Sequence, residues 1–594
     1  MDRFQALDMP VSLSQRQNFM LDSSAMLTTS HSYERRGKVR VQPSAHSRSR
    51  LLSPPARLNS LFDSAHARAR VVQVFNDPVH GHIYLSGMAC DIIGASLSWL
   101  KLGARARRGH CLLASRPLTR SPHSPLVLRY YHTDTPQFQR LRDLKQLGLT
   151  YLVFPGASHN RFEHSLGTCH LANGVFTHLY RLQKDDLGVD RMDGEVVALA
   201  GLCHDLGHGP FSHVFDTEFL PRRLEGHYNA HMWSHEQMSA DMLKFLVDEN
   251  HLNVDEDIIK RVSDLITSGH TAPAAAGGAS SSATATVGRH PQFLRDIVAN
   301  GRNSVDVDKF DYLERDCLNC GLKNSADFGR LIMYSKVIDD EICYKASEVL
   351  NLYELFHTRA SLHQRVYTHR KAKAIEYMVV DCLLHADVAW GGEISNAIRS
   401  PKSFQRLDDT ILKRIEWSED PKLRDAKTIL ERLRRRELYR YVNEFAVPQS
   451  RLAKWPDHGV TPADVVSCQD AKGGVQLRPE DVIVHNLKID WTSKNKNPVD
   501  SINFFQDYDS MEKFAIPREK VSSLIPETFI ERKVRVFCKR SDQESADALE
   551  RAFLNFQKRD FGDSLHVHST PVKKSRKRSL EQRLADSVAA VPTQ

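Results

Sequence analysis

The segment Leu202–His213 reads LCHDLGHGPFSH, and it decides the fold that we expect for this 594-residue chain. Apolar residues upstream of it recur on one stripe of a helix, and Gly209–Pro210 ends that helix. His204 and Asp205 are neighbours near the helix end, and His208 follows His204 by one turn. An adjacent His–Asp pair offers one nitrogen and one oxygen ligand from a rigid element, which suits a divalent ion such as iron, manganese, zinc or magnesium.

Two further metal ligands are expected elsewhere in the chain. His164 lies seven residues before Leu171, so it faces the same way as the buried stripe of its helix. Asp308 lies in a helical run among inward-facing apolar residues, where a carboxylate is costly unless it is paired or binds a metal. A lone inward histidine is more often a hydrogen-bonded core residue, but the combination with His204–Asp205 favours a metal site. Many titratable groups surround it: His208, His213, Asp216, His235 and Glu236.

Composition changes mark the segments on the N-terminal side of this region. Residues 1–70 are rich in Ser, Arg and Met without a helical or strand period, so we expect them to be disordered. A strand–turn–strand is predicted at Val71–Leu85. Residues 94–133 carry seven basic residues and no acidic one, and they interrupt what reads as one helical hairpin, Asp91–Ile93 followed by Asp134–Leu147. They are either a lineage-specific loop or translated non-coding sequence, and we favour the second interpretation.

Helical periodicity dominates the chain from Asp134 to about Asn443. A low-complexity stretch predicts a flexible loop at residues 271–290, and helices are expected to resume at Gln292 and run through Leu430–Tyr441. A spacing of i, i+4, i+8 and i+11 predicts one buried helix face formed by Leu171, Val175, Leu179 and Leu182.

The expected fold is mainly α, with a small α+β lobe and disordered ends. The helical domain is predicted to cover residues 71–446. Short β-branched runs at Val482–His485 and Lys533–Lys539 predict the α+β lobe at residues 447–568. Residues 569–594 are polar and basic, and we expect them to be disordered.

Charge and cysteine usage restrict the class of protein. The formal net charge of +8 permits contact with phosphates or nucleic acid. The chain has no run of about 18 apolar residues and no apolar secretory segment, so neither a membrane span nor a membrane partner is expected. Ten cysteines are scattered without a disulfide framework, as in a reducing compartment, and the lone Cys317–Cys320 pair is interpreted as ordinary helix cysteines.

The H…HD…D pattern on helices is that of the HD phosphohydrolase superfamily. Longer strings resemble one of its families, the SAM-and-HD-domain deoxynucleoside triphosphate triphosphohydrolases. The resemblance covers about Val71–Phe561, apart from the stretches 94–133 and 271–290. The family begins with a SAM domain, for which residues 1–70 are too polar and aperiodic, so we expect this chain to lack it. The resembling strings are NDPVHGHI, DTPQFQRLR, FPGASHNRFEHSLG, GLCHDLGHGPFSH, DVDKFDYLERDC, LFHTRASLHQRVY and DPKL.

The resemblance implies hydrolysis of a dNTP to a deoxynucleoside and inorganic triphosphate, and thereby control of the cellular dNTP pool and restriction of viral reverse transcription. The HD site would hold zinc, iron or manganese, and magnesium would accompany the nucleotide phosphates. The four metal ligands are expected to be His164, His204, Asp205 and Asp308. Histidine suits protonation of the leaving 5′-oxygen because its pKa lies near working pH, and we assign that role to His213. The α-phosphate and water would be positioned by His208, His235 and Asp216.

Substrate recognition is expected from residues beside these ligands. Arg161 and Lys309 would clamp the triphosphate as cations. Asp316 and Gln146 can hydrogen-bond a 3′-hydroxyl, whereas Leu147 leaves no partner for a 2′-hydroxyl and so disfavours ribonucleotides. The remaining residues of the expected substrate site are Tyr312, Arg359 and Tyr367.

The resemblance also implies activation by GTP or dGTP in one site and a dNTP in a neighbouring site, both bridging subunits of a homotetramer built as a dimer of dimers. Gln73, Ser347 and Asp507 stand where the family has lysine, and Lys345 where it has arginine, so weaker activator binding is expected. The expected activator residues are Val74, Asn76, His82, Asp134, Gln139, Arg142, Val153, Arg330, Lys345, Asn351, Arg365, His369, Arg370, Arg436 and Arg440.

The C-terminal tail carries two further signals. Thr570 lies in a T-P-x-K motif, a site for a proline-directed, cyclin-dependent kinase. The basic cluster Lys573–Arg578 is compatible with nuclear import or contact with single-stranded nucleic acid, and we expect the nucleus, with the cytoplasm as a second location. Two alternative functions stay open at this point, an HD phosphodiesterase or nuclease and a non-enzymatic nucleic-acid-binding protein.

Overall fold

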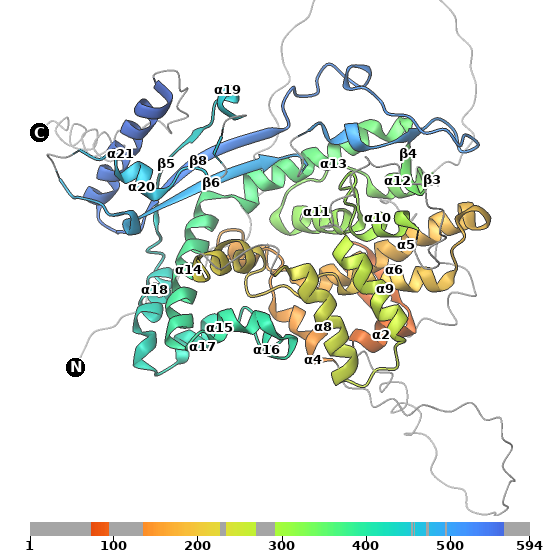
Figure 1. Ribbon diagram of the computed structural model, residues 1–594, viewed down its shortest axis with the longest axis horizontal. Helices are drawn as coiled ribbons and strands as arrows, with labels where there is room; N and C mark the ends of the chain where they lie inside the picture. Colours follow the sequence, from red (N-terminus) through yellow and green to blue (C-terminus); the bar gives the residue numbers. More distant parts are fainter. Residues whose placement is uncertain are drawn as a thin grey trace, which may run out of the picture. The chain divides into compact units, whose positions relative to one another are not determined.

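The computed structural model describes residues 73–93, 135–225, 233–268, 291–452, 455–456, 458–470, 474–492 and 496–562 (Figure 1). All of these residues belong to one compact unit, Arg57–Gln594. The predictions for residues 1–70, 94–133, 271–290 and 569–594 lie outside the described residues, as do those for Asp134 and Thr570. In the part of the chain that is described, no helix is long and apolar enough to span a membrane.

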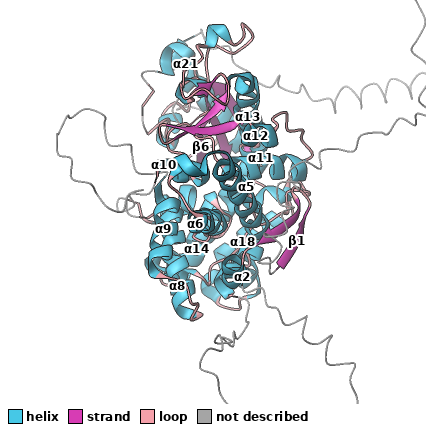
Figure 2. Cartoon of the chain, turned by 90° about the vertical axis from the view of Figure 1, so that its right-hand side faces the viewer, coloured by secondary structure: helices cyan, strands magenta, loops and turns pink. Residues whose placement is uncertain are grey.

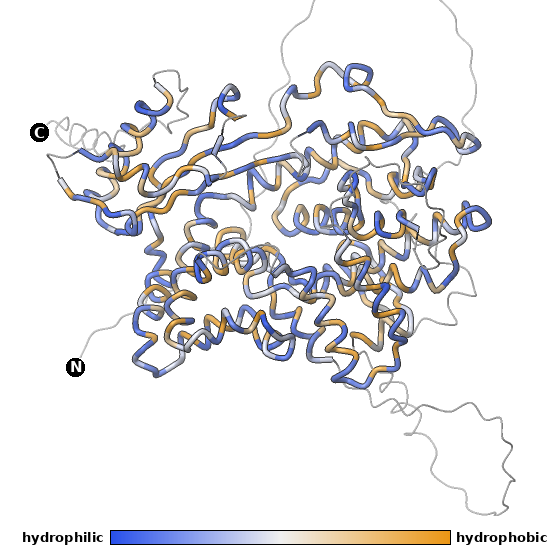
Figure 3. Tube along the Cα trace, viewed as in Figure 1, coloured by the Kyte–Doolittle hydropathy of each residue, from blue (hydrophilic) through white to orange (hydrophobic). Residues whose placement is uncertain are grey.

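Helices make up most of the described residues, which confirms the mainly α fold (Figure 2). Apolar and polar residues alternate along them, and the apolar ones pack into one main hydrophobic core (Figure 3). The longer helices are α5 (Arg161–Leu187), α6 (Arg191–Cys203), α8 (His235–Glu249), α9 (Glu256–Thr267), α11 (Val307–Cys320), α13 (Val349–Leu362), α14 (Arg370–Ala389), α18 (Arg424–Arg434) and α21 (Gln543–Phe561).

Short helical segments connect the longer ones. The α-helical segments are α2 (Gly87–Ile93), α4 (Pro136–Gln139), α7 (Leu220–Arg223), α10 (Gln292–Val298), α12 (Phe328–Met333), α15 (Glu393–Asn396), α16 (Pro401–Phe404), α17 (Ile411–Trp417), α19 (Gln449–Leu452) and α20 (Pro462–Val466). Two π-helical segments are η4 (Phe215–Phe219) and η7 (His363–Tyr367). The 3₁₀ segments are η2 (Arg140–Asp143), η3 (Gly148–Leu152), η6 (Ala346–Glu348), η8 (Ala397–Arg399), η9 (Pro421–Leu423), η10 (Pro479–Asp481), η11 (Pro498–Ser501) and η12 (Arg518–Lys520).

Helix α5 packs between α6 and α11 and carries the first expected metal ligand. A capping box begins it, because Asn160 accepts a hydrogen bond from the backbone of Glu163 while the Glu163 carboxylate accepts one from the backbone of Asn160. Of the predicted buried face, Leu171, Val175 and Leu179 are buried, but Leu182 is 44% exposed, so the prediction for Leu182 was wrong.

A kink at the end of α5 explains this difference. Gln183 leaves helical geometry with a φ of −137°. Its side chain turns inward instead of that of Leu182, donating to the carbonyl of Val337 at 2.8 Å and accepting from the Val337 amide at 2.7 Å. Helical periodicity therefore fails at the point where the side chain of Gln183 pairs with a strand.

Three small sheets complete the described fold. Strands β1 (Gln73–Asp77) and β2 (Gly81–Leu85) form the expected hairpin, with Asn76 opposite His82. The second sheet has the order β3 (Ser335–Ile338), β4 (Glu341–Lys345), β7 (Phe504–Phe505), and the third has the order β5 (Arg440–Ala446), β8 (Ile530–Cys538), β6 (Val482–Asp490). In the third sheet both pairs are antiparallel.

Strand β5 replaces the end of an expected helix. We expected helix through Leu430–Tyr441, but α18 ends at Arg434 and β5 begins at Arg440. Arg436, with a φ of +62°, takes a left-handed conformation that cannot continue a helix. Pairing with β8, which lies about a hundred residues downstream, overrides the local helical preference. The sheet of the C-terminal lobe therefore takes in residues upstream of Val447.

The two flanks of residues 94–133 lie in direct contact. Thr135 Oγ1 donates to the carbonyl of Ile92 at 2.5 Å, and Gln139 Nε2 donates to the carbonyl of Ile93 at 3.0 Å. The end of α2 and the start of α4 are therefore adjacent, as the predicted interruption of one helical hairpin requires.

Candidate active site

One cleft of about 770 Å³ is lined by every residue that the sequence predicts to bind metal or substrate. Side chains reach it from α5, from the turn after α6, from α11 and from the region of α13 and η7. Of the predicted catalytic residues, His208, His213 and His235 line it as well, and Asp216 contacts two of them.

The four predicted metal ligands face one another in this cleft. His164 Nε2 lies 3.4 Å from Asp205 Oδ2 and 3.1 Å from Asp308 Oδ1. His204 Nε2 lies 3.5 Å from Asp205 Oδ1 and 3.4 Å from Asp308 Oδ1. An ion about 2.0–2.2 Å from each donor would place neighbouring donors about 3.0–3.6 Å apart. The spacing of His164, His204 and Asp308 therefore fits a divalent cation, and Asp205 lies beside them with a different carboxylate oxygen toward each imidazole.

The Nδ1 atoms of His164 and His204 are hydrogen-bonded to other protein groups, so that Nε2 of each ring faces the other predicted ligands. His164 Nδ1 bonds to Asp311 Oδ2 at 2.6 Å, and His204 Nδ1 bonds to the carbonyl of Gly201 at 2.8 Å. A metal-binding histidine is oriented in this way when its other ring nitrogen donates to a carboxylate or carbonyl. His204 Nε2 is buried without a hydrogen-bond partner among the described residues. A cation would satisfy this nitrogen.

The charges of the set also favour a cation. Burial lowers the pKa of His164, but its bonds to Asp308 and Asp311 outweigh this and raise the pKa to about 10. Burial raises the pKa of Asp205, but Arg161 above all holds it well below its usual range. Carboxylates that stay ionised beside imidazoles provide mixed oxygen and nitrogen ligation, and a metal would compete with the proton on His164.

A buried network extends from His164 to the β1–β2 hairpin. Asp311 also bonds to His80 Nε2 at 2.6 Å and to Arg315 Nε at 2.8 Å, and Arg315 Nη1 reaches Asp77 Oδ2 at 2.9 Å. All of these side chains are nearly or fully buried. The sequence analysis missed Asp311, although its place one turn after Asp308 on an inward helix face was a usable signal.

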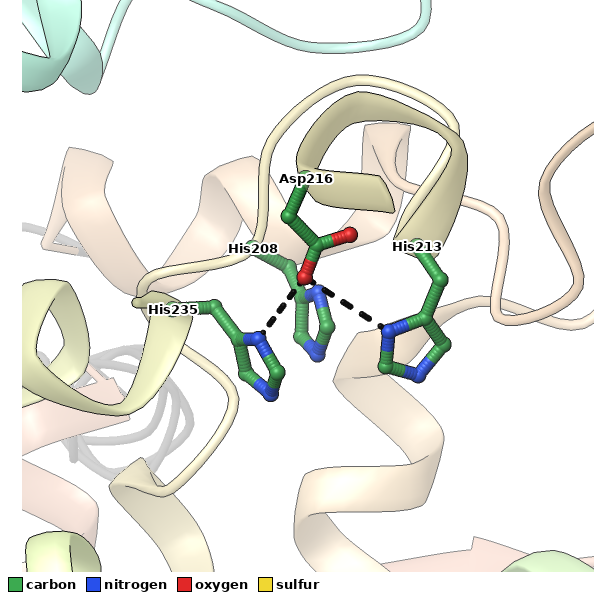
Figure 4. A group of neighbouring side chains, drawn as sticks. All are labelled: His208, His213, Asp216 and His235. Atoms are coloured by element: carbon green, nitrogen blue, oxygen red, sulfur yellow. Dashed lines mark hydrogen bonds and ion pairs between the residues drawn. The ribbon is translucent and has the colours of Figure 1, made fainter. Parts of the chain in front are cut away.

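Asp216 organises the histidine cluster beside the metal ligands (Figure 4). Its Oδ2 lies 2.9 Å from His235 Nδ1 and 3.6 Å from His213 Nδ1. The ring of His208 stacks on that of His235 at 4.0 Å. Three elements contribute: the turn after α6, the π-helical segment η4, and the first residue of α8.

The cluster sets different proton affinities for its members. Desolvation lowers the pKa of His213, but the hydrogen bond and charge of Asp216 outweigh this and raise it. Burial, and then the charge of Arg161, hold the pKa of His208 well below its usual value. The His213 side chain is 65% exposed, and its Nε2 lies on the side of the ring away from Asp216 (Figure 4). His213 is therefore an exposed imidazole with a raised pKa, next to His208, an imidazole with a lowered pKa.

The turn that carries His213 has an unusual backbone. Phe211 and Ser212 have φ angles of +62° and +57°, a conformation that costs free energy in residues with side chains. Asp409 holds this turn, because its Oδ1 accepts from the Phe211 amide at 2.6 Å and its Oδ2 from the Lys145 amide at 2.8 Å. Sequence analysis missed Asp409, since nothing local marks a carboxylate whose partners are distant in the chain.

The cationic side chains that are expected to bind the triphosphate line the cleft and also contact other protein groups. Arg161 Nη1 forms an ion pair with Asp205, and its Nε donates to Ser212 Oγ at 2.9 Å. Lys309 Nζ lies 3.2 Å from Asp306. Arg359 Nη1 donates to the carbonyl of Asp490 at 2.5 Å. Arg161 therefore also orients an expected metal ligand.

The expected sugar-recognising residues all line the cleft. Asp316 Oδ2 accepts a hydrogen bond from Tyr367 Oη at 2.5 Å, and Asp316 Oδ1 lies 2.6 Å from His159 Nε2. Gln146 Oε1 is buried without a partner among the described residues. Leu147 and Tyr312 line the same cleft. Sequence analysis did not single out His159.

Those expected activator residues whose side chains the structure describes do not line this cleft. Arg330 pairs with Glu348, and Asn351 donates to the same carboxylate at 3.2 Å. Arg142 donates to Gln139 Oε1 at 2.7 Å. Asp134 and the side chain of Val74 lie outside the described residues. Of the other residues of this set, Asn76, His82, Lys345, Arg365, Arg370 and Arg440 each lie on a different element, whereas Val153, His369 and Arg436 lie in connecting segments.

Comparison with known proteins identifies the family. Residues 161–316 match the HD domain. The chain is 43% identical over 426 residues to the deoxynucleoside triphosphate triphosphohydrolase SAMHD1 homolog of Dictyostelium discoideum, covering 72% of this chain and 76% of that protein. It is 37% identical to the human deoxynucleoside triphosphate triphosphohydrolase SAMHD1, covering 85% and 77%, and 35% identical to that of the mouse, covering 86% and 76%. The chain therefore belongs to the SAMHD1 family of HD-domain deoxynucleoside triphosphate triphosphohydrolases.

Proposed function

We propose that this chain is a metal-dependent hydrolase that converts a dNTP into a deoxynucleoside and inorganic triphosphate. The observation that carries the proposal is a single cleft that holds the His–Asp ligand set, an accessible protonatable histidine and an unsatisfied Gln146 amide beside Asp316. The printed names of the relatives support the same activity.

The proposed metal ligands are His164, His204, Asp205 and Asp308. The donors of His164, His204 and Asp308 lie close enough together to share one cation, and Asp205 lies 3.4 Å and 3.5 Å from the two imidazoles. When bound, the ion supplies Lewis-acid chemistry, which draws charge from a phosphoryl oxygen and activates water. Imidazole and carboxylate donors are compatible with zinc, iron or manganese, and magnesium would accompany the phosphates of the nucleotide.

Bond cleavage is proposed at the α-phosphorus. A water oxygen forms a bond to that phosphorus and gives up a proton to solvent, the bond between the phosphorus and the 5′-oxygen breaks, and the leaving 5′-oxygen takes a proton. His213 is the proposed donor, because Asp216 raises its pKa and its exposed side chain lines the cleft. His208, held neutral by burial and Arg161, can hydrogen-bond the phosphoryl group or the water without competing for that proton.

The cations and polar groups of the cleft hold the rest of the nucleotide. Lys309 and Arg359 lie where they can balance the triphosphate charge. Asp316 and Gln146 are proposed to bind the 3′-hydroxyl. Leu147 offers no partner for a 2′-hydroxyl, so a ribonucleotide would lose the hydrogen bonds that this group makes to water.

Product analysis tests the proposal. Purified protein is incubated with dATP and manganese, with and without GTP, and the products are separated by ion-exchange chromatography. We expect deoxyadenosine and triphosphate in equal amounts, and no product from the His204→Ala, Asp205→Ala double variant. Pyrophosphate with dAMP, or phosphodiester cleavage of an oligonucleotide with dATP untouched, would reject it in favour of another HD phosphohydrolase activity.

The finer features of the family are part of the same proposal. GTP or dGTP and a dNTP are proposed as activators of a homotetramer, at affinities reduced by the residues Gln73, Lys345, Ser347 and Asp507. Control of the dNTP pool, and through it restriction of reverse transcription, would follow from the activity. A nuclear location, phosphorylation of Thr570 by a cyclin-dependent kinase and binding of single-stranded nucleic acid are proposed from the basic tail.

A further inference from the structure

His159 connects the two residues that are proposed to bind the 3′-hydroxyl. It lies on the segment before α5, and its side chain is buried, with 4% of the residue exposed. Its backbone carbonyl accepts a hydrogen bond from the Gln146 amide at 3.0 Å, and its ring Nε2 lies 2.6 Å from Asp316 Oδ1. One residue thus contacts the backbone of Gln146 and the carboxylate of Asp316.

The segment that carries His159 is fixed on both sides. Asn160 pairs with Lys145 in an isolated β-bridge, and the Arg161 amide donates to the carbonyl of Leu144 at 2.9 Å. On the other side a Cβ on Gly156 would lie only 2.2 Å from the carbonyl oxygen of Asn319, so the segment abuts the last turn of α11. This close approach sets the distance from which His159 reaches Asp316.

Asp316 is held through both of its carboxylate oxygens. His159 contacts Oδ1, while Tyr367 Oη donates to Oδ2 at 2.5 Å. A carboxylate accepts about four hydrogen bonds, so lone pairs remain for a ligand after these two contacts. Because two different elements hold the two oxygens, the plane of the carboxylate is fixed before a substrate arrives. Asp316 is itself buried, which makes each hydrogen bond to it more valuable than on the surface.

We propose that His159 is a positioning residue that determines selectivity for substrates with a 3′-hydroxyl. The proposal rests on the proposed dNTP hydrolysis. A hydroxyl can donate its one proton to the Asp316 carboxylate and accept a hydrogen bond from the side-chain NH₂ of Gln146, which lines the same cleft. Without His159 the carboxylate would keep only the Tyr367 contact and could rotate out of the position in which it accepts the hydroxyl proton.

Comparing kcat/KM for substrates with and without a 3′-hydroxyl distinguishes this positioning role from a general role in folding. A site built to hydrogen-bond a hydroxyl rejects a substrate without it, because its buried polar groups are then left unpaired. Loss of His159 should therefore lower kcat/KM for dATP and leave kcat/KM for 2′,3′-dideoxy-ATP unchanged. A loss of folding or of metal would lower both values equally.

The experiment measures triphosphate release from dATP and from 2′,3′-dideoxy-ATP by full-length, metal-loaded protein. We expect His159→Phe to lower the ratio of the two kcat/KM values at least about 10-fold, the scale of one such hydrogen bond to a charged group. His159→Gln keeps a side-chain donor at comparable reach and should restore most of the ratio. If the Phe variant fails to fold, His159→Asn, which is too short to reach Asp316, replaces it.

A matched control is His170→Phe, which removes another buried histidine of the same region outside the cleft and should leave the ratio unchanged. An unchanged ratio in His159→Phe, or in His159→Asn where it replaces the Phe variant, or an equal loss with both substrates, would overturn the proposal. A failure of the proposed function is visible separately, because wild-type protein would then release no triphosphate from dATP.

Discussion

The metal site depends on a residue that is not itself a ligand. Asp311 is fully buried on α11 and bonds to His164 Nδ1 at 2.6 Å, while Arg315 and His80 hold its carboxylate in place. An imidazole whose Nδ1 donates to a carboxylate is a stronger and better oriented donor at Nε2. The affinity of the site for a cation is therefore set partly by a side chain that does not touch the ion.

Replacing Asp311 with Asn should weaken metal binding. We expect Asp311→Asn to raise the Kd for manganese about 10- to 100-fold, because the amide cannot accept from His164 as strongly as the carboxylate. Competition with a fluorescent chelator measures the affinity directly. Asp257→Asn, at the exposed start of α9, is the control and should bind manganese as wild type does. An unchanged Kd in a folded Asp311→Asn variant would contradict this account.

His213 should limit activity at high pH. Asp216 raises the pKa of His213, so the ring keeps its proton at neutral pH and loses it as the pH rises through that raised pKa. A general acid works only while protonated, so kcat should fall along this alkaline limb. In Asp216→Asn the limb should move to lower pH. His213→Gln should lose about 10²- to 10⁴-fold in kcat at neutral pH and show no such limb. A wild-type alkaline limb that persists in His213→Gln would assign the proton to another group.

At the residue scale, the metal ligands predicted from the sequence lie together in the structure, whereas the residues that position them were not predicted. His164, His204, Asp205 and Asp308 were recognisable because each is a metal-binding residue type among apolar neighbours, and the structure places them around one cleft. His159 and Asp409 act through partners that lie 157 residues and at least 198 residues away, respectively. No periodicity or spacing within one sequence indicates such pairs.

At the scale of the elements, the packing of α5 against α11 depends on one close contact, at Gly167. Gly167 on α5 faces the buried pair of Asp311 and Arg315, and a Cβ at this position would lie 1.8 Å from Asp311 Oδ1 and 2.5 Å from Arg315 Nη2. Both atoms are held in a buried ion pair, so neither can move without leaving a charge poorly compensated. The glycine is required for packing rather than for backbone freedom.

Gly167→Ala should therefore destabilise the fold. We expect a loss of about 2–4 kcal/mol in the free energy of unfolding, from overpacking and disruption of the buried pair. The comparison is Gly188→Ala at the C-terminus of the same helix, where φ is +61° and nothing lies within 4 Å of the added Cβ. That variant should lose only about 1 kcal/mol, the cost of a left-handed alanine. Equal losses in urea unfolding would show that the contact at Gly167 is not tight.

Helices and strands were predicted correctly where the local sequence pattern determines them. The β1–β2 hairpin and strands β6 and β8 followed from turn residues and β-branched runs. The β3–β4 hairpin and β5 were not predicted, because β5 forms only by pairing with β8 and its own sequence continues an arginine-rich helical pattern. The predicted burial of Leu182 was wrong for a related reason, the pairing of Gln183 with a strand. Non-local pairing explains both differences.

At the scale of the whole molecule, the contact between the two flanks of residues 94–133 predicts that this stretch can be removed. Ile92 and Thr135 are hydrogen-bonded to each other, so a short join can connect them without moving α2 or α4. We expect a variant without residues 94–133 to keep the wild-type Tm and the basal rate of dATP hydrolysis. Activation by GTP should be equal or greater, because the stretch directly precedes Asp134 of the expected guanine site. A lower Tm would show that these residues belong to the folded core.

The central claim for the molecule as a whole is attack at the α-phosphorus of a dNTP. Hydrolysis of dATP in ¹⁸O-labelled water, followed by mass spectrometry of both products, tests it most directly. We predict one ¹⁸O atom in the triphosphate and none in the deoxyadenosine. Label in the deoxyadenosine, or in dAMP or pyrophosphate, would contradict the account.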